Sequence, residues 1–325
     1  MTIPGLMLRA TTLGHAVPRT AYAQGVVYAT AAGIALGTLG PLSNIAYAAG
    51  MSSPTFAALR ATIGALVLAV FLVTTRAERV PLRTLAARDR ALLGLTAVAQ
   101  AALSLAVFAA YGAMAVAPVL AVYFCYPLIV AGASIVLGRE RLTPTRALAL
   151  TVALGGLVVV VLGGSSGSGR VTAAGLALAG IAAACQATYL VASRSGFTRV
   201  PSQQATGVIL GVAAILMWLV AAPFEVASNT LGSWLTAPTA WIAVAVAGIL
   251  GAALAKVWML RGVRRVGGTR AAVLMLAEPI TGVLLAAILL GQDLTTIQLA
   301  GGVAVLGGAL LAQRPAPAVA AAAPR

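Results

Sequence analysis

The sequence predicts an all-α integral membrane protein with ten transmembrane helices, arranged as two inverted five-helix repeats. Three observations lead to this fold class: the composition, the number of apolar segments, and the distribution of arginine between those segments. Of 325 residues, 61% are hydrophobic and 8% are charged, whereas a typical soluble domain has about 25% charged residues. A soluble protein built around one hydrophobic core is excluded on this composition.

Clusters of charge and of Gly, Pro and Ser divide the chain into ten apolar segments. A bilayer-spanning helix needs about 20 apolar residues, and only the fifth segment is clearly short of that length. The segments comprise residues 25–47, 55–73, 91–114, 118–137, 146–162, 173–192, 204–222, 241–260, 271–290 and 295–312.

The Gly- and Ser-rich stretch 163–172 has the composition of a flexible linker and separates the chain into halves. Residues 25–162 are predicted to form the first five-helix repeat and residues 173–312 the second. Residues 1–24 lack the continuous apolar stretch of a signal peptide and are predicted to be a retained cytoplasmic tail. The Ala- and Pro-rich residues 313–325 are predicted to be a disordered tail.

The two halves align with each other at their Pro and Gly residues. A shift of 147 superimposes Pro54 on Pro201 and Gly33 on Gly180, and a shift of 152 superimposes Pro127 on Pro279. Because each half has an odd number of spans, the second half must enter the membrane in the opposite orientation. Inverted repeats of this kind are typical of transporters.

Arginine between the segments falls on one side of the predicted membrane. The segments 74–90, 138–146, 193–203 and 261–270 carry Arg, whereas 48–54, 115–118, 223–240 and 291–294 contain no Lys or Arg. The positive-inside rule makes the Arg-rich side cytoplasmic, so both termini are predicted to lie in the cytoplasm of a multi-pass protein of the cell membrane. Only Arg170, in the linker, departs from this pattern.

The formal net charge of +15 is explained by these cytoplasmic segments. No basic run alternates with aromatic residues, as nucleic-acid binding would require, so no nucleic-acid partner is predicted.

Cys125 and Cys185 lie in apolar segments without metal-site or redox spacing. The chain contains a single His, and no catalytic set of Ser, His and Asp, no Walker loop and no metal cluster is recognisable. No cofactor, no metal and no enzymatic activity are predicted.

Glu278 is the sharpest candidate for function. It lies about eight residues into the segment 271–290, near mid-depth at about 1.5 Å rise per residue, where a carboxylate is costly and by default functional. Pro279 follows it and frees a backbone carbonyl about four residues earlier, which predicts a helix kink. The alternative is a neutral, hydrogen-bonded Glu that only ties helices together.

The other candidates each have a structural alternative. Tyr126 and the kink residue Pro127 are the repeat counterparts of Glu278 and Pro279, but an intramembrane tyrosine can simply pack with its hydroxyl satisfied. Lys256 and Arg60 are candidates for substrate binding or coupling, but their long side chains could instead extend to the membrane interface. The repeat partner of Lys256 is Ser104, which is a candidate as well. The uncharged set is predicted to include cavity residues, with helix–helix hydrogen bonding as the alternative; it comprises Thr38, Asn44, Gln100, Gln186, Thr188 and Tyr189. Glu225 and Asp293 are predicted to be solvated in outer loops, and His15 in the tail.

Three stretches resemble a known family. They are SSPTFAALRATIGALVLAV (52–70), YPLIVAGASIVLGRERLTPTRALALTVALGGLVVVVLG (126–163) and AEPITGVLLAAILLGQDLTTIQLAGGVAVLGGALLA (277–312). Together they resemble the EamA-type members of the drug/metabolite transporter superfamily, over about residues 25–312. The resemblance implies a ten-helix carrier in which helices three, four, eight and nine line most of the cavity, helices one and six contribute, and helices five and ten pack behind.

The functional hypothesis is a secondary active transporter, an exporter of small organic metabolites such as amino acids, that works by alternating access. Glu278 is predicted either to couple transport to protons or to bind an amino group of the substrate. A multidrug efflux carrier and an uncoupled facilitator are the alternatives within transport. An intramembrane lipid enzyme would need a nucleophile and a base near one interface, and a membrane scaffold would not need an ionisable residue at mid-depth. The expected partners are a small-molecule substrate, the lipid bilayer and protons, and both a monomer and a homodimer stay open.

Overall fold

The computed structural model describes residues 19–113, 116–138, 143–163, 172–228, 234–290 and 295–312. Within these ranges the chain is helical and forms no β-strand. The predicted tails up to residue 18 and from residue 313, with His15, lie outside the described residues, as do Asp293 and most of the predicted linker.

In its described part, the first half contains seven α-helices and one short 3-10 helix, η1 (Leu82–Thr84). The α-helices are α1 (Arg19–Gly37), α2 (Leu39–Ala48), α3 (Ser53–Thr74), α4 (Ala87–Ala113), α5 (Val116–Tyr123), α6 (Tyr126–Val136) and α7 (Pro144–Gly163). Helix α1 starts at Arg19, ahead of the apolar segment expected from residue 25, because polar residues among its first six (Arg19, Thr20 and Gln24) lower the local hydropathy.

The second half is helical throughout its described length. It consists of α8 (Ala173–Ser195), α9 (Ser202–Ser228), α10 (Pro238–Val246), the π-helix η2 (Ala247–Leu254), α11 (Ala255–Val266), α12 (Gly268–Leu274), α13 (Ala277–Leu290) and α14 (Thr296–Ala312). Helix starts follow local rules: Ser52 accepts a hydrogen bond from the Thr55 backbone N–H (3.3 Å) at the start of α3, and Thr172 accepts one from Gly175 (3.1 Å) at the start of α8.

Among the described residues, six helical stretches are long and apolar enough to cross a membrane: Thr20–Ala48, Ser53–Thr74, Ala87–Val107, Ala173–Arg194, Ser202–Ser228 and Pro238–Val266. Shorter apolar helices cover Tyr126–Val136, Ala147–Val159 and Leu299–Gly308. Large apolar side chains face outward, for example Val136 (87% exposed) and Ile288 (75% exposed), as expected for a surface in contact with lipid. The protein is therefore a helical, multi-pass membrane protein, and the count of ten spans stays a prediction.

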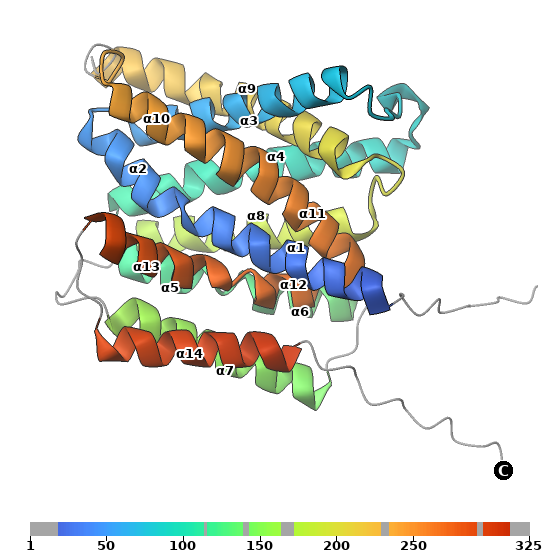
Figure 1. Ribbon diagram of the computed structural model, residues 1–325, viewed down its shortest axis with the longest axis vertical. Helices are drawn as coiled ribbons and strands as arrows, with labels where there is room; N and C mark the ends of the chain where they lie inside the picture. Colours follow the sequence, from blue (N-terminus) through green and yellow to red (C-terminus); the bar gives the residue numbers. More distant parts are fainter. Residues whose placement is uncertain are drawn as a thin grey trace, which may run out of the picture.

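The two halves are interleaved rather than separate. Helix α3 packs against α9, α4 against α8, α1 against α11, and α6 against α12. Helices α7 and α14 form a pair at one edge of the molecule, and α3 and α9 lie at the opposite edge (Figure 1). Every one of these pairs takes one helix from each half.

The pair α7–α14 is held by glycine. A Cβ atom on Gly156 would lie 2.7 Å from the Gly301 carbonyl oxygen, and one on Gly308 would lie 2.6 Å from the Ala153 backbone nitrogen. Such distances leave no room for a side chain, so the small-residue pattern brings the two backbones together. Gly302 and Gly307, by contrast, face open space.

Glu225 is not in a solvated outer loop, and that prediction was wrong. Helix α9 continues through Pro223 to Ser228, and the Glu225 side chain is only 2% exposed. Its carboxylate accepts a hydrogen bond from Thr55 Oγ1 (2.5 Å) and another from Ser52 Oγ. The carboxylate is thus satisfied by the hydroxyl groups at the N-terminus of α3, where a negative charge is also stabilised by the helix dipole.

Candidate functional site

Two helices are interrupted directly before the paired prolines. Helix α5 ends at Tyr123 and α6 begins at Tyr126; likewise α12 ends at Leu274 and α13 begins at Ala277. Within the second break, the Glu278 N–H donates to the Met275 carbonyl oxygen at 2.9 Å, a tighter turn than the α-helical pattern. Both interruptions occur where Pro127 and Pro279 remove backbone donors from a helix interior.

Two further irregularities are not signalled by proline. Helix α1 gives way to α2 at Thr38, whose hydroxyl donates to the Ala35 carbonyl oxygen at 2.7 Å. The π-helix η2 lies between α10 and α11 and ends two residues before Lys256. π-Helical turns are frequent at functional sites, so this stretch is a second indication of where the site lies.

Three charged side chains from both halves come together in the interior. Arg60 on α3 is 6% exposed, Lys256 on α11 is 4% exposed, and Glu278 in the first turn of α13 is partly exposed. They lie close enough to one another for their charges to interact. We call these three residues the central charged cluster. Both cations are buried among other side chains, and their role in substrate binding or coupling stays a prediction.

The cations of the central charged cluster have unequal surroundings. The Lys256 ammonium lies over the ring of Tyr189, 5.1 Å from its centroid, a cation–π contact that stabilises a charge removed from water. The Nε of Arg60 has no hydrogen-bond partner among the described residues. A buried donor without a partner is costly.

Tyr126 touches the cluster but packs tightly. Its side chain is fully buried, and its hydroxyl donates to the Ala272 carbonyl oxygen at 3.4 Å. Its ring lies 5.6 Å from that of Tyr123, centroid to centroid. Tyr126 also interacts electrostatically with Glu278, and Tyr123 with Arg60. In this conformation Tyr126 therefore links α6 to α12 and borders the charges without facing open space.

The uncharged candidates are dispersed. Gln100 donates to Ser104 (3.2 Å) along α4, and Gln186 donates to the sulfur of Met259 (3.8 Å), which joins α8 to α11. Oε1 of each glutamine is buried without a hydrogen-bond partner in the described structure. Thr38 occupies the α1–α2 break, and Asn44 is exposed on α2. The structure thus groups the charged candidates and Tyr126, and does not bring Asn44 to them.

Two residues at the cluster are missing from the strongest sequence candidates. Tyr189, predicted only as one of a polar set, holds the Lys256 ammonium, and Tyr123 borders Arg60. Tyr123 could have been found from the aromatic run Tyr123-Phe124-Cys125-Tyr126 that precedes Pro127. No sequence signal marks Tyr189, because its role depends on a contact between α8 and α11.

The Arg-rich end of the molecule is tied together by hydrogen bonds. The Arg264 guanidinium on α11 donates to the carbonyl oxygens of Phe197 (3.0 Å) and Val200 (2.9 Å) and to Ser202 Oγ (3.2 Å). The Phe197 N–H in turn donates to the Asp89 carboxylate (3.1 Å) on α4. These contacts join α4 and α11 to the connection between α8 and α9.

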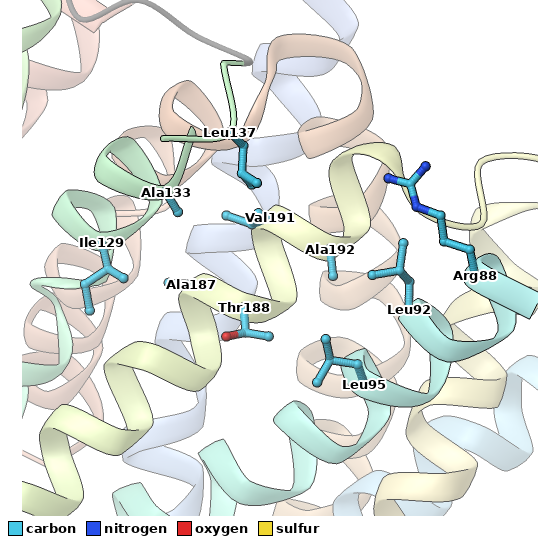
Figure 2. A pocket seen from close by; sticks show the side chains of 10 residues that line it. All are labelled: Arg88, Leu92, Leu95, Ile129, Ala133, Leu137, Ala187, Thr188, Val191 and Ala192. Atoms are coloured by element: carbon cyan, nitrogen blue, oxygen red, sulfur yellow. The ribbon is translucent and has the colours of Figure 1, made fainter. Parts of the chain in front are cut away.

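A separate apolar groove of about 310 Å³ opens between α4, α6 and α8 (Figure 2). Its polar side chains are Thr188 and Arg88, and it is lined by Arg88, Leu92, Leu95, Ile129, Ala133, Leu137, Ala187, Thr188, Val191 and Ala192. Since none of the central charged cluster lines it, the groove is distinct from the candidate site.

The model of the EamA-like transporter family matches residues 23–162 and again residues 173–313. Among solved structures, one described only as a crystal structure of a protein has a TM-score of 0.76 and 23% sequence identity; the alignment covers 89% of this chain and 96% of that one. At this identity the likeness concerns the fold alone. No significant match to a curated protein is found.

Proposed function

Because the chain belongs to the EamA-like transporter family, and is thus a membrane transporter, we propose that it is a secondary active exporter of small organic metabolites such as amino acids. In this proposal the protein lies in the cell membrane with both termini in the cytoplasm, and Glu278 couples transport to protons. The central charged cluster carries the proposal, since buried ionisable groups in a membrane protein mark substrate or ion pathways.

The position of the cluster supports a transport site. Glu278 lies at a break within a helix, and interrupted helices commonly form the substrate and ion sites of transporters. The cluster draws Arg60 from the first half and Lys256 and Glu278 from the second. A site shared between halves changes its accessibility when one half moves against the other, which is what alternating access needs.

The pairing of helices supports an inverted repeat. In the two repeats α1 corresponds to α8, and α11 corresponds to α4. The contact between α1 and α11 therefore has its counterpart in the contact between α8 and α4, and both are among the most extensive contacts of the fold. The paired breaks before Pro127 and Pro279 obey the same exchange. An inverted repeat would therefore relate the two halves by a pseudo-twofold axis in the membrane plane.

Transport into and out of proteoliposomes tests the function. Purified protein is reconstituted and offered a panel of amino acids, other small metabolites and drug-like cations, with and without an imposed pH gradient. We expect at least one small metabolite to accumulate against its gradient only when the pH gradient is present. Equilibration without accumulation would indicate a facilitator, preference for the drug-like cations a multidrug carrier, and no movement of any compound would contradict the proposal.

The proposed topology is tested by cysteine labelling in intact cells. In a variant without Cys125 and Cys185, a single cysteine is introduced at Ser228 or at Thr84, both exposed. A membrane-impermeant maleimide should label position 228 from outside and leave position 84 unlabelled until the cells are opened. Labelling of position 84 but not 228 in intact cells would reverse the proposed orientation of the whole molecule, and the same labelling of both positions would contradict the inversion of the second half.

Pro279→Ala tests whether the break before α13 serves movement. Alanine restores a backbone donor, so we expect α12 and α13 to form a more continuous helix and the transport rate to fall about tenfold, roughly 1.4 kcal/mol. Expression and elution as a single species should be unchanged, because neighbouring helices can satisfy the backbone at a kink. Pro223→Ala in α9, remote from the cluster, is the control and should transport normally; normal transport by Pro279→Ala would remove the functional role of the break.

A further inference from the structure

We propose that the solute recognised at the central charged cluster is a monocarboxylate anion, and that Arg60 binds its carboxylate. The inference rests on the proposed transport function. It adds the charge of the substrate and the side chain that binds the charged group. It is carried by the burial of Arg60, its unpartnered Nε and the excess of positive charge around it.

The charge balance of the cluster leaves one positive charge uncompensated. Arg60 and Lys256 are both almost fully buried, whereas Glu278 supplies one carboxylate. A buried charge without a counter-charge is strongly unfavourable unless a partner neutralises it. A ligand with one negative charge makes the ionised cluster neutral, while a phosphate monoester, with a charge of about −1.5 to −2, would exceed the available positive charge.

Arg60 is the better receptor of the two cations. A guanidinium presents donors in a planar fork that matches the two oxygens of a carboxylate, and Nε of Arg60 lacks a hydrogen-bond partner among the described residues. The Lys256 ammonium already lies over the Tyr189 ring. Lys256 therefore adds positive charge to the site, whereas Arg60 has a buried donor that a ligand carboxylate would satisfy.

The three charges of the cluster together determine which solutes the site prefers. The Glu278 carboxylate interacts with both cations, so a substrate carboxylate that approaches Arg60 competes with Glu278 for the same positive charge. A cationic amine would instead meet two like charges, each desolvated, and like charges brought together in a buried site repel strongly. The ranking expected from these charges is carboxylate first, zwitterion second, and amine or neutral amide last.

Probes that share a carbon skeleton and differ in charge test this ranking. The first set is 3-phenylpropionate, phenylalanine, phenethylamine and 3-phenylpropionamide; the second is propionate, alanine, ethylamine and propionamide. Binding is measured on the full-length protein in lipid nanodiscs, as a concentration-dependent rise in the temperature of unfolding. We expect at least one carboxylate to stabilise the protein and its matched amine and amide to have no effect.

Variants assign the effect to Arg60. Arg60→Gln should weaken carboxylate binding at least about tenfold, roughly 1.4 kcal/mol, and remove the preference over the amide. Arg60→Lys, which keeps the charge without the fork, should bind with intermediate strength. Arg83→Gln removes the same charge from an exposed cytoplasmic position and should bind as the wild type does.

The outcomes separate this inference from the proposed function. Stabilisation by an amine rather than a carboxylate, by none of the carboxylates, or undiminished carboxylate binding in a well-folded Arg60→Gln would overturn the inference. Should Arg60→Gln fail to fold, the wild-type ranking of the probes decides alone. Transport of metabolites in the proteoliposome panel tests the exporter function independently. A protein that carried amines would support the proposed transport function and contradict the proposal that the substrate is an anion.

Discussion

Glu278→Gln is expected to abolish accumulation driven by a pH gradient, down to the level of liposomes without protein. Glutamine keeps the size and hydrogen-bonding capacity of glutamate but can neither exchange a proton nor carry a charge beside Arg60 and Lys256. The variant should express and elute as the wild type does, because glutamine fills the same space in the first turn of α13. Transport is measured in proteoliposomes with and without the gradient.

Two other variants make this result specific. Glu278→Asp retains the carboxylate on a shorter side chain and should keep partial activity. Glu225→Gln alters a buried carboxylate that binds Ser52 and Thr55 and is not part of the central charged cluster, so it should lower stability without changing the dependence on pH. If Glu278→Gln transported at the wild-type rate with the wild-type dependence on pH, Glu278 would be structural and proton coupling through it would be wrong.

Gly37→Leu is expected to have the largest effect on folding. A Cβ atom at this position would lie 2.5 Å from the Glu278 carbonyl oxygen and 2.7 Å from the Thr281 side chain, so leucine must push α1 away from α13. Overpacking of this kind costs about 1–3 kcal/mol, and here it displaces the helix that carries the cluster carboxylate. Thermal unfolding followed by size-exclusion chromatography should show a lower midpoint and a smaller monodisperse fraction.

Gly40→Leu is the matched control, because a Cβ on Gly40 in the adjacent helix α2 meets no atom within 4 Å. It should unfold at nearly the wild-type temperature. Equal midpoints for Gly37→Leu and Gly40→Leu would show that α1 and α13 are not held at the separation described.

Local chemistry explains what could be predicted about this fold. Apolar length located the helices, and the prolines at 127 and 279 marked both breaks, since each removes a backbone donor from a helix interior. The same rule failed at Pro223, where α9 continues and carries Glu225 to the hydroxyls of α3. Whether a proline ends a helix thus depends on packing that local sequence does not contain.

The site was predictable in its residue types but not in its contacts. Glu278, Lys256 and Arg60 stand out because charge is rare in apolar segments. The burial of Lys256 and Arg60 could not be predicted. A long cationic side chain stays in the interior only where it finds partners such as Tyr189, and those contacts depend on the tertiary fold. The π-helix before Lys256 carries no proline to reveal it.

The central charged cluster is not duplicated between the halves, and this has an energetic consequence. The positions that correspond to Arg60, Lys256 and Glu278 in the other half are Gly207, Ser104 and Tyr126, all uncharged. In an inverted repeat the two opposite-facing states arise when the halves exchange conformations, and identical halves would make those states equally populated. In the inverted repeat proposed here, each state would surround the charges with different groups, so sequence divergence would set the resting equilibrium and favour one side of the membrane before any solute binds.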